Sequence, residues 1–155
     1  LVFFCQNNQW AISSAVETQT KVPLYRRGEG FGVPGIRVDG NDVLAVHADC
    51  SRAIADIRAG GGPWLVEYSV YRWREHCGPN FDNDIGYRSV EEYEDWRRRE
   101  PIGLLRGKLG SLVAGFAELE SLMVGELRRE VDAAFAFAEE SPFPAAEEAF
   151  LGEYA

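Results

Sequence analysis

A strand, a helix and a second strand follow one another between residues 36 and 71, and this order constrains the fold more than any other feature. Residues 36–40 form a short β-prone run, and Asn41 or Asp42 can cap a helix that ends at three consecutive glycines. Residues 64–71 are again rich in β-formers. Two strands joined by a helical crossover lie parallel in one sheet, so we predict an α/β fold.

An apolar run opens the chain and changes abruptly into paired amides at Asn7 and Asn8. Such a run is typical of a buried strand, and the carboxyl ends of strands in open α/β sheets are where ligands bind. Two asparagines there form either a simple turn or a metal site, because a neutral amide oxygen can coordinate Mg²⁺. The run begins without an initiator Met, so we expect the carboxy-terminal part of a longer polypeptide. A breaker-rich connector without long regular structure is predicted to follow.

Residues 72–88 lack periodicity and form a predicted long loop directly after a strand, and loops of this length are usually functional. Arg72 can clamp a diphosphate at the strand ends or form an ordinary salt bridge. His76 can serve as an acid, a base or a hydrogen-bond donor, or it is an exposed bystander. His47 lies on the predicted first helix, and we interpret it as structural.

The remainder of the chain has a helical pattern. Ser89 and Glu92 form a predicted capping box, and Pro101 marks the next helix boundary. A last helix is predicted over about residues 117–139, with one apolar stripe that favours packing over chemistry.

Composition and charge narrow the classes of function. The 155 residues are 46% hydrophobic, which suffices for one real core. The net charge of −9 disfavours nucleic acid as a partner. No apolar stretch approaches the ~20 residues that span a bilayer, so we expect no membrane association. Three widely spaced cysteines indicate neither a disulfide framework nor a zinc site and fit a reducing cytoplasm.

Five blocks of sequence occur in a distinctive order: residues 4–13 (FCQNNQWAIS), 34–43 (PGIRVDGNDV), 71–76 (YRWREH), 87–88 (YR) and 100–102 (EPI). In these blocks the chain resembles the alpha subunit of the thiamine-diphosphate-dependent first component of 2-oxo acid dehydrogenase complexes. That family includes pyruvate, branched-chain 2-oxo acid and acetoin dehydrogenases. The resemblance implies part of a thiamine-diphosphate-binding α/β domain over residues 1–88, with a parallel sheet flanked by helices. It also implies a helical carboxy-terminal extension over residues 89–155, packed on that domain.

The resemblance implies roles for four residues. Asn8 is expected to coordinate Mg²⁺ through its side chain, and Trp10 through its backbone carbonyl. Arg72 is expected to hold the diphosphate of thiamine diphosphate. His76 is the expected catalytic residue, which stands over the bound cofactor and assists acyl transfer onto the lipoyl group. In this family the loop that carries the histidine orders when the cofactor binds.

The implied activity is oxidative decarboxylation of a pyruvate-like 2-oxo acid with acyl transfer to lipoamide. The implied partners are a beta subunit, in an α₂β₂ heterotetramer, and a lipoyl-bearing acyltransferase. One alternative is an acetoin-type or pathway-specific carboligase or lyase that never acylates lipoamide. Another is an inactive fragment, because the family's Gly-Asp-Gly motif, which supplies the other Mg²⁺ ligand, lies before the position of Leu1.

Departures from the family pattern limit what the resemblance implies. Cys77 and Gly86 stand where mitochondrial members carry phosphorylated serines, so we expect no phosphorylation control of that kind. Residues 74–79 also differ from the histidine-rich blocks of the pyruvate and branched-chain enzymes. The sequence therefore leaves the identity of the 2-oxo acid open.

Overall fold

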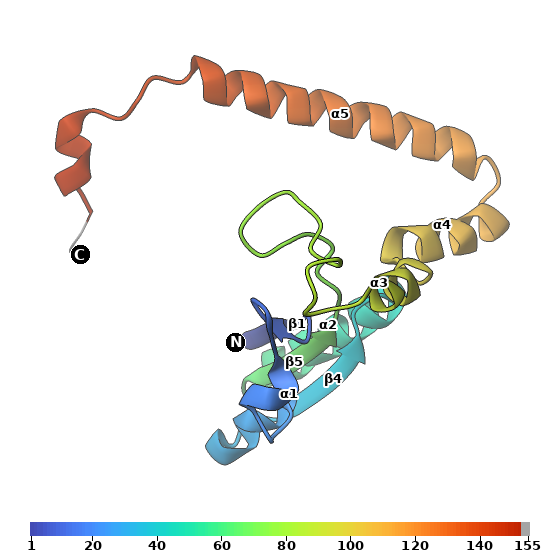
Figure 1. Ribbon diagram of the computed structural model, residues 1–155, viewed down its shortest axis with the longest axis vertical. Coiled ribbons are helices and arrows are strands. Elements are labelled where there is room, and N and C mark those ends of the chain that lie inside the picture. Colours follow the sequence, from blue (N-terminus) through green and yellow to red (C-terminus); the bar gives the residue numbers. More distant parts are fainter. Residues whose placement is uncertain (153–155) are drawn as a thin grey trace. The chain divides into compact units, whose positions relative to one another are not determined.

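The computed structural model describes residues 1–152, and its sheet confirms the predicted α/β class. Strands β1 (Val2–Asn7), β5 (Trp64–Ser69) and β4 (Gly35–Asp39) are all parallel and lie in the order β1-β5-β4 (Figure 1). Helix α2 (Val43–Arg58) connects β4 to β5, as the strand-helix-strand pattern predicts. The central strand is therefore the one that comes last in the sequence.

The core lies between α2 and one face of the sheet. Ala53 of α2 packs against Val66 and Tyr68 of β5, and all three residues are buried. Side chains alternate between the two faces of a strand, so Glu67 points to the opposite face from Val66 and Tyr68.

The helix cap resolves the choice between the two predicted capping residues. Asp42 is the N-cap of α2, and its carboxylate accepts the N–H groups of Leu44 at 3.0 Å and Ala45 at 3.3 Å. Asn41 is buried instead, and its amide donates to the backbone carbonyl of Arg99 at 3.0 Å.

The segment between β1 and β4 has more local structure than a plain connector. A hairpin of β2 (Trp10–Ala11) and β3 (Ser14–Ala15) leads into the single-turn helix α1 (Val16–Gln19). The 3₁₀ helix η1 (Leu24–Phe31) follows. These elements are short, as the density of glycine and proline in the sequence predicts.

Strand β5 ends at Ser69, two residues before its predicted end at Tyr71. Asn7 of β1 and Asp39 of β4 both pair with Ser69 as their last register position. The prediction is wrong at this point because β-forming residues continue beyond the place where both neighbouring strands stop. The long loop consequently begins at Val70.

Helices occupy the remainder of the described chain. They are α3 (Val90–Arg97), α4 (Pro101–Leu112), α5 (Phe116–Glu140) and the short 3₁₀ helix η2 (Ala146–Phe150). The hydroxyl of Ser89 accepts the N–H of Glu92 at 3.1 Å, which confirms Ser89 as the predicted cap of α3. No helix within residues 1–152 is long and apolar enough to cross a membrane.

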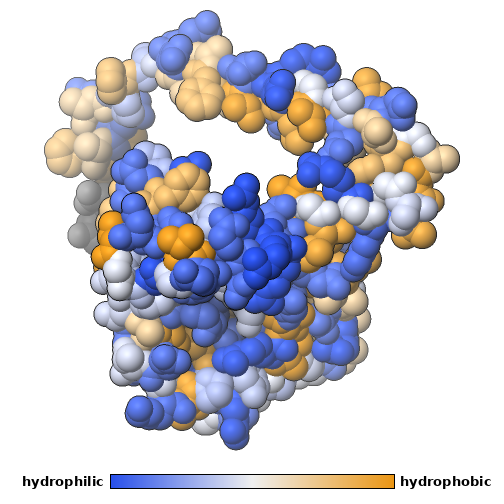
Figure 2. Space-filling view, turned by 45° about the vertical axis from the view of Figure 1, so that its right-hand side comes forward, coloured by the Kyte–Doolittle hydropathy of each residue, from blue (hydrophilic) through white to orange (hydrophobic). Residues whose placement is uncertain are grey.

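The apolar stripe of α5 is exposed. Leu122, Leu127 and Phe135 are 67%, 57% and 67% exposed, and Figure 2 shows hydrophobic side chains on the surface of this helix. The chain divides into two compact units, residues 1–108 and the residues from 109 onward. The predicted domain division at residues 88 and 89, with the extension packed on the α/β part, stays a prediction.

Candidate functional site

Two asparagines build a tight turn at the carboxyl end of β1. The side-chain oxygen of Asn7 accepts the N–H of Gln9 at 2.9 Å, and that of Asn8 accepts the N–H of Trp10 at 2.9 Å. Gln9 and Ile12 have φ angles of 67° and 59°, a left-handed conformation that is uncommon outside glycine. The two hypotheses for these asparagines are compatible, because an amide oxygen in a turn keeps a second lone pair for a cation.

The side chain of Asn7 is held by Glu67, a residue that belongs to none of the predicted sites. The amide nitrogen of Asn7 donates to the carboxylate of Glu67 at 2.7 Å, and Glu67 is 0% exposed in the middle of the central strand. A carboxylate within an otherwise apolar strand is the signal that points to this position.

A buried ion-pair cluster forms the other half of the candidate site. Asp82 is 2% exposed and accepts hydrogen bonds from Arg72 at 3.0 Å and also from Tyr87 and Arg88. Arg72 further contacts the Tyr87 hydroxyl at 2.5 Å, and its Nε donates to the carbonyl of Arg74 at 3.0 Å. These contacts hold the last part of the loop after β5 against its first residues.

The electrostatics of this cluster favour an ionised Asp82. Burial raises the pKa of Asp82, but hydrogen bonds from Tyr87, Arg88 and Arg72 outweigh burial and lower the pKa below its ordinary value. Burial and the hydrogen bond to Asp82 raise the pKa of Tyr87, so its phenol stays protonated.

The carbonyl of Ile12 joins the turn to the ion-pair cluster. Nη1 and Nη2 of Arg72 each donate to this oxygen at 3.2 Å. The ring of Trp10 meets the ring of Tyr87 edge to face, with the centroids 5.1 Å apart. The structure therefore brings three predicted residues, Asn8, Trp10 and Arg72, into one contact network.

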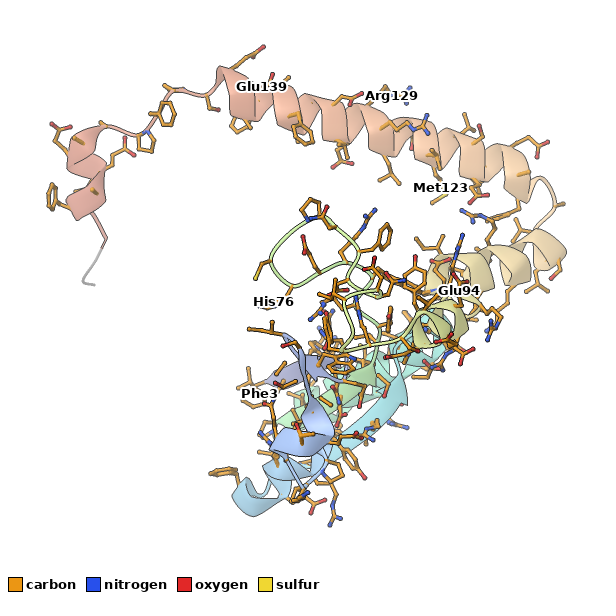
Figure 3. All side chains as sticks on the ribbon, viewed as in Figure 1. Phe3, His76, Glu94, Met123, Arg129 and Glu139 are labelled. Atoms are coloured by element: carbon orange, nitrogen blue, oxygen red, sulfur yellow. The ribbon has the colours of Figure 1, made fainter. Side chains whose placement is uncertain are left out.

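His76 does not belong to this network. It lies on the loop after β5 (Figure 3), its side chain is exposed, and within the described residues it forms neither a hydrogen bond nor an ion pair. Its neighbour Glu75 accepts the N–H and the amide of Asn80 at 3.2 and 2.8 Å, which closes a small turn in the loop. Cys77 is also exposed. The predicted catalytic role of His76 stays a prediction.

Two cavities border β1. One of about 270 Å³ lies on the α2 side and is lined in part by Phe4, Cys50 and Tyr68. The other, of about 220 Å³, is lined in part by Asn7 and Arg37. Neither of these two cavities is lined by Arg72 or His76.

Comparison with known proteins decides the family. Residues 1–147 match the family model described as dehydrogenase E1 component. The chain belongs to the dehydrogenase E1 component family. This membership confirms the family that the five sequence blocks predict.

Several E1 alpha subunits are similar to this E1 chain. The 3-methyl-2-oxobutanoate dehydrogenase subunit alpha of Mycobacterium tuberculosis is 49% identical over 102 residues, which cover 65% of this chain and 27% of the relative. The pyruvate dehydrogenase E1 component subunit alpha of Porphyra purpurea is 36% identical over 146 residues, 93% of this chain and 41% of the relative. The corresponding subunit of Zymomonas mobilis is 35% identical over 161 residues, covering 99% and 44%. The chain therefore spans less than half the length of these relatives.

Proposed function

We propose that this chain is part of the alpha subunit of a thiamine-diphosphate-dependent 2-oxo acid dehydrogenase. The complete enzyme would decarboxylate a 2-oxo acid oxidatively and pass the acyl group to lipoamide. The observation that carries the proposal is the contact of Arg72 with the Ile12 carbonyl, which joins the Asn8 turn to Arg72 at the carboxyl end of β1. Membership of the E1 family and the names of the relatives support the same activity.

The oxygen atoms and the N–H groups at this end of the sheet suit a Mg²⁺-diphosphate group. Mg²⁺ takes oxygen ligands and completes its shell with phosphate oxygens. Asn8 would supply its side-chain oxygen, and Trp10 its backbone carbonyl. Arg72 has four hydrogen-bond acceptors around it, yet Nη1 donates only to Ile12, so one of its N–H groups has no partner among the described residues. That N–H suits a phosphate oxygen.

When bound, thiamine diphosphate supplies the nucleophilic carbon and the electron sink for cleaving the bond beside the keto carbon. The residues of this chain would bind the cofactor and orient it. Arg72 would hold the diphosphate, and the buried Asp82 would keep the guanidinium in place through their 3.0 Å ion pair. His76, on the exposed part of the loop, would assist acyl transfer as a proton donor or acceptor.

The proposal extends to partners and compartment. A beta subunit would complete an α₂β₂ heterotetramer, and a lipoyl-bearing acyltransferase would accept the acyl group. Cys5, Cys50 and Cys77 are all free thiols, which suits the reducing cytoplasm.

The test uses the full-length alpha subunit produced together with its beta subunit. With Mg²⁺ and thiamine diphosphate present, we expect a 2-oxo acid to reduce a dye acceptor, and EDTA to abolish the reaction. Pyruvate and 3-methyl-2-oxobutanoate are compared, because the relatives carry both names. Acylation of a free lipoyl domain then separates a dehydrogenase from a carboligase. An enzyme that joins aldehydes but leaves the lipoyl domain unmodified would contradict the proposal.

A further inference from the structure

We infer that Glu67 is a positioning residue for the proposed Mg²⁺ site. Its buried carboxylate sets the orientation of the Asn7 amide, and through that amide it holds the turn that presents Asn8. The inference rests on the proposed function, because it assigns to Glu67 a part in holding the same metal.

Three elements converge on this one side chain. Oε1 of Glu67 accepts the Asn7 amide at 2.7 Å from β1 and Nε of Arg37 at 2.9 Å from β4. Oε2 accepts the backbone N–H of Tyr25 at 2.7 Å from η1. The carboxylate is 0% exposed, and both of its oxygens are occupied.

The contact with Asn7 decides which way the amide points. An ionised carboxylate only accepts hydrogen bonds, so the NH₂ group of Asn7, rather than its oxygen, must face Glu67. The Asn7 oxygen is then left to accept the N–H of Gln9 at 2.9 Å. With the amide reversed, an NH₂ group would face the Gln9 N–H and the turn would lose this bond. Asn8 is the next residue and forms its own bond across the same turn, to the N–H of Trp10.

Stability of the sheet does not by itself explain a carboxylate at this position. Burying a charge is expensive, and an apolar residue of similar size would serve the centre of a sheet at lower cost. What an apolar residue cannot do is fix the orientation of a neighbouring amide. Because Glu67 bonds to Asn7 and Asn8 is the next residue in the same turn, the carboxylate supports the site through Asn7.

The experiment exchanges the amide and the carboxylate between the two positions in the full-length protein with its beta subunit. Glu67→Gln places an NH₂ group against either the Asn7 amide or the Tyr25 N–H. Asn7→Asp places two carboxylates in contact. The double variant N7D/E67Q restores a donor facing an acceptor between positions 7 and 67 and leaves a carboxylate oxygen at position 7 for the Gln9 N–H. It restores no acceptor for Arg37, which loses its bond to position 67 in E67Q and in the double variant alike.

Metal binding is the readout, measured by electron paramagnetic resonance of Mn²⁺ titrated in the presence of thiamine diphosphate. We expect each single variant to raise the Mn²⁺ dissociation constant about tenfold or more, as for other groups that orient a metal ligand. We expect the double variant to bind Mn²⁺ more tightly than either single variant. Arg26→Gln is the control, because it removes an exposed ion pair with Glu29 in η1 and does not contact Glu67. It should leave Mn²⁺ binding unchanged.

Thermal unfolding of every variant shows whether it is folded. Should Glu67→Gln not fold, Asn7→Asp decides alone: a tenfold loss of Mn²⁺ affinity supports the inference, and wild-type affinity overturns it. Folded single variants that bind Mn²⁺ normally, or a double variant no better than Asn7→Asp, also overturn it. A wild-type protein that fails to bind Mn²⁺ with thiamine diphosphate would overturn the proposed function, and this inference with it.

Discussion

Asn7 and Asn8 are neighbours of the same residue type in different environments. Asn7 is 5% exposed and is held between Glu67 and the N–H of Gln9. Asn8 is half-buried, and the bond that it accepts from Trp10 leaves its oxygen with a lone pair. Successive residues at the end of a strand point to opposite sides, so Asn7 faces the interior and Asn8, the proposed Mg²⁺ ligand, does not.

Replacing His76 tests the predicted catalytic residue. Because the side chain is exposed and touches none of the other predicted site residues, His76→Ala should leave binding of thiamine diphosphate unchanged. Acylation of a lipoyl domain should fall by about 100-fold or more, the usual contribution of a general acid or base. The measurement is single-turnover acylation beside a dye-reduction assay. His47→Ala, on the exposed surface of α2, is the control. An unchanged acylation rate would remove His76 from the mechanism.

The sequence alone predicts the positions of the candidate ligands but not what supports them. Asn8 and Arg72 stand out because each comes near the end of an apolar strand. The contacts of Tyr87 and Arg88 with Asp82 could not be predicted, since these residues reach it only when the loop folds back on itself. Glu67 has no local pattern that names Asn7 as its partner, because the contact depends on which strands are neighbours.

At the scale of elements, the loop from residue 70 to residue 89 is organised around one buried carboxylate. Asp82 connects Arg72 at the start of the loop with Tyr87 and Arg88 at its end. Aromatic rings extend this contact into α3: Tyr71 stacks on Trp96, with centroids 5.5 Å apart, and meets Trp73 edge to face at 5.0 Å.

The stability of this loop should decrease at acid pH. The pKa of Asp82 is lowered in the folded protein, so its ion pairs stabilise the fold fully above the ordinary carboxyl pKa of about 4. That stabilisation is lost as the pH falls through the lowered, folded-state pKa. Asp82→Asn should cost about 3 kcal/mol at pH 7, because it leaves the buried Arg88 and the half-buried Arg72 without their charge partner.

Fluorescence of the loop tryptophan Trp73 during an acid titration reports this transition. Wild type should show a transition in the acid range that Asp82→Asn lacks. Asp84→Asn, an exposed residue of the same loop, is the matched control and should behave as wild type. Identical titrations of wild type and Asp82→Asn would show that other groups control the loop.

The backbones of η1 and β4 approach each other closely at Tyr25 and Gly35, and this contact should restrict position 35 to glycine. A β-carbon on Gly35 would collide with the backbone carbonyl of Tyr25, which has no freedom to rotate away. Gly35→Ala should therefore lower the free energy of unfolding by about 1–3 kcal/mol. Gly30→Ala is the control, since a β-carbon there meets no atom within 4 Å. Urea denaturation of both variants measures the difference, and equal midpoints would contradict the prediction.

At the scale of the whole molecule, the two compact units differ in how they are stabilised. The unit of residues 1–108 contains the sheet and the buried core of Ala53, Val66 and Tyr68. In the other unit, α5 runs for 25 residues with no buried residue. Helix propensity and periodicity therefore predict α5 well from the sequence, whereas nothing in that pattern says what its apolar stripe contacts.

Exposed apolar side chains of α5 should make the 155-residue chain associate when it is produced alone. We expect concentration-dependent sedimentation and binding of an apolar dye. Leu122→Lys together with Leu127→Lys should reduce both, because these side chains are 67% and 57% exposed. Ser121→Lys adds charge to the same helix without removing an apolar group. A monomeric wild-type chain at all concentrations would contradict the prediction.

The central place of β5 also governs the order in which the sheet can assemble. β1 and β4 both pair with β5, yet β5 is the last of the three to be synthesised. Val2 therefore meets Trp64 only after α2 has been made, and closing so long a loop slows folding. Until β5 is made, β1 cannot form its pairing with β5, and an unpaired strand edge favours aggregation.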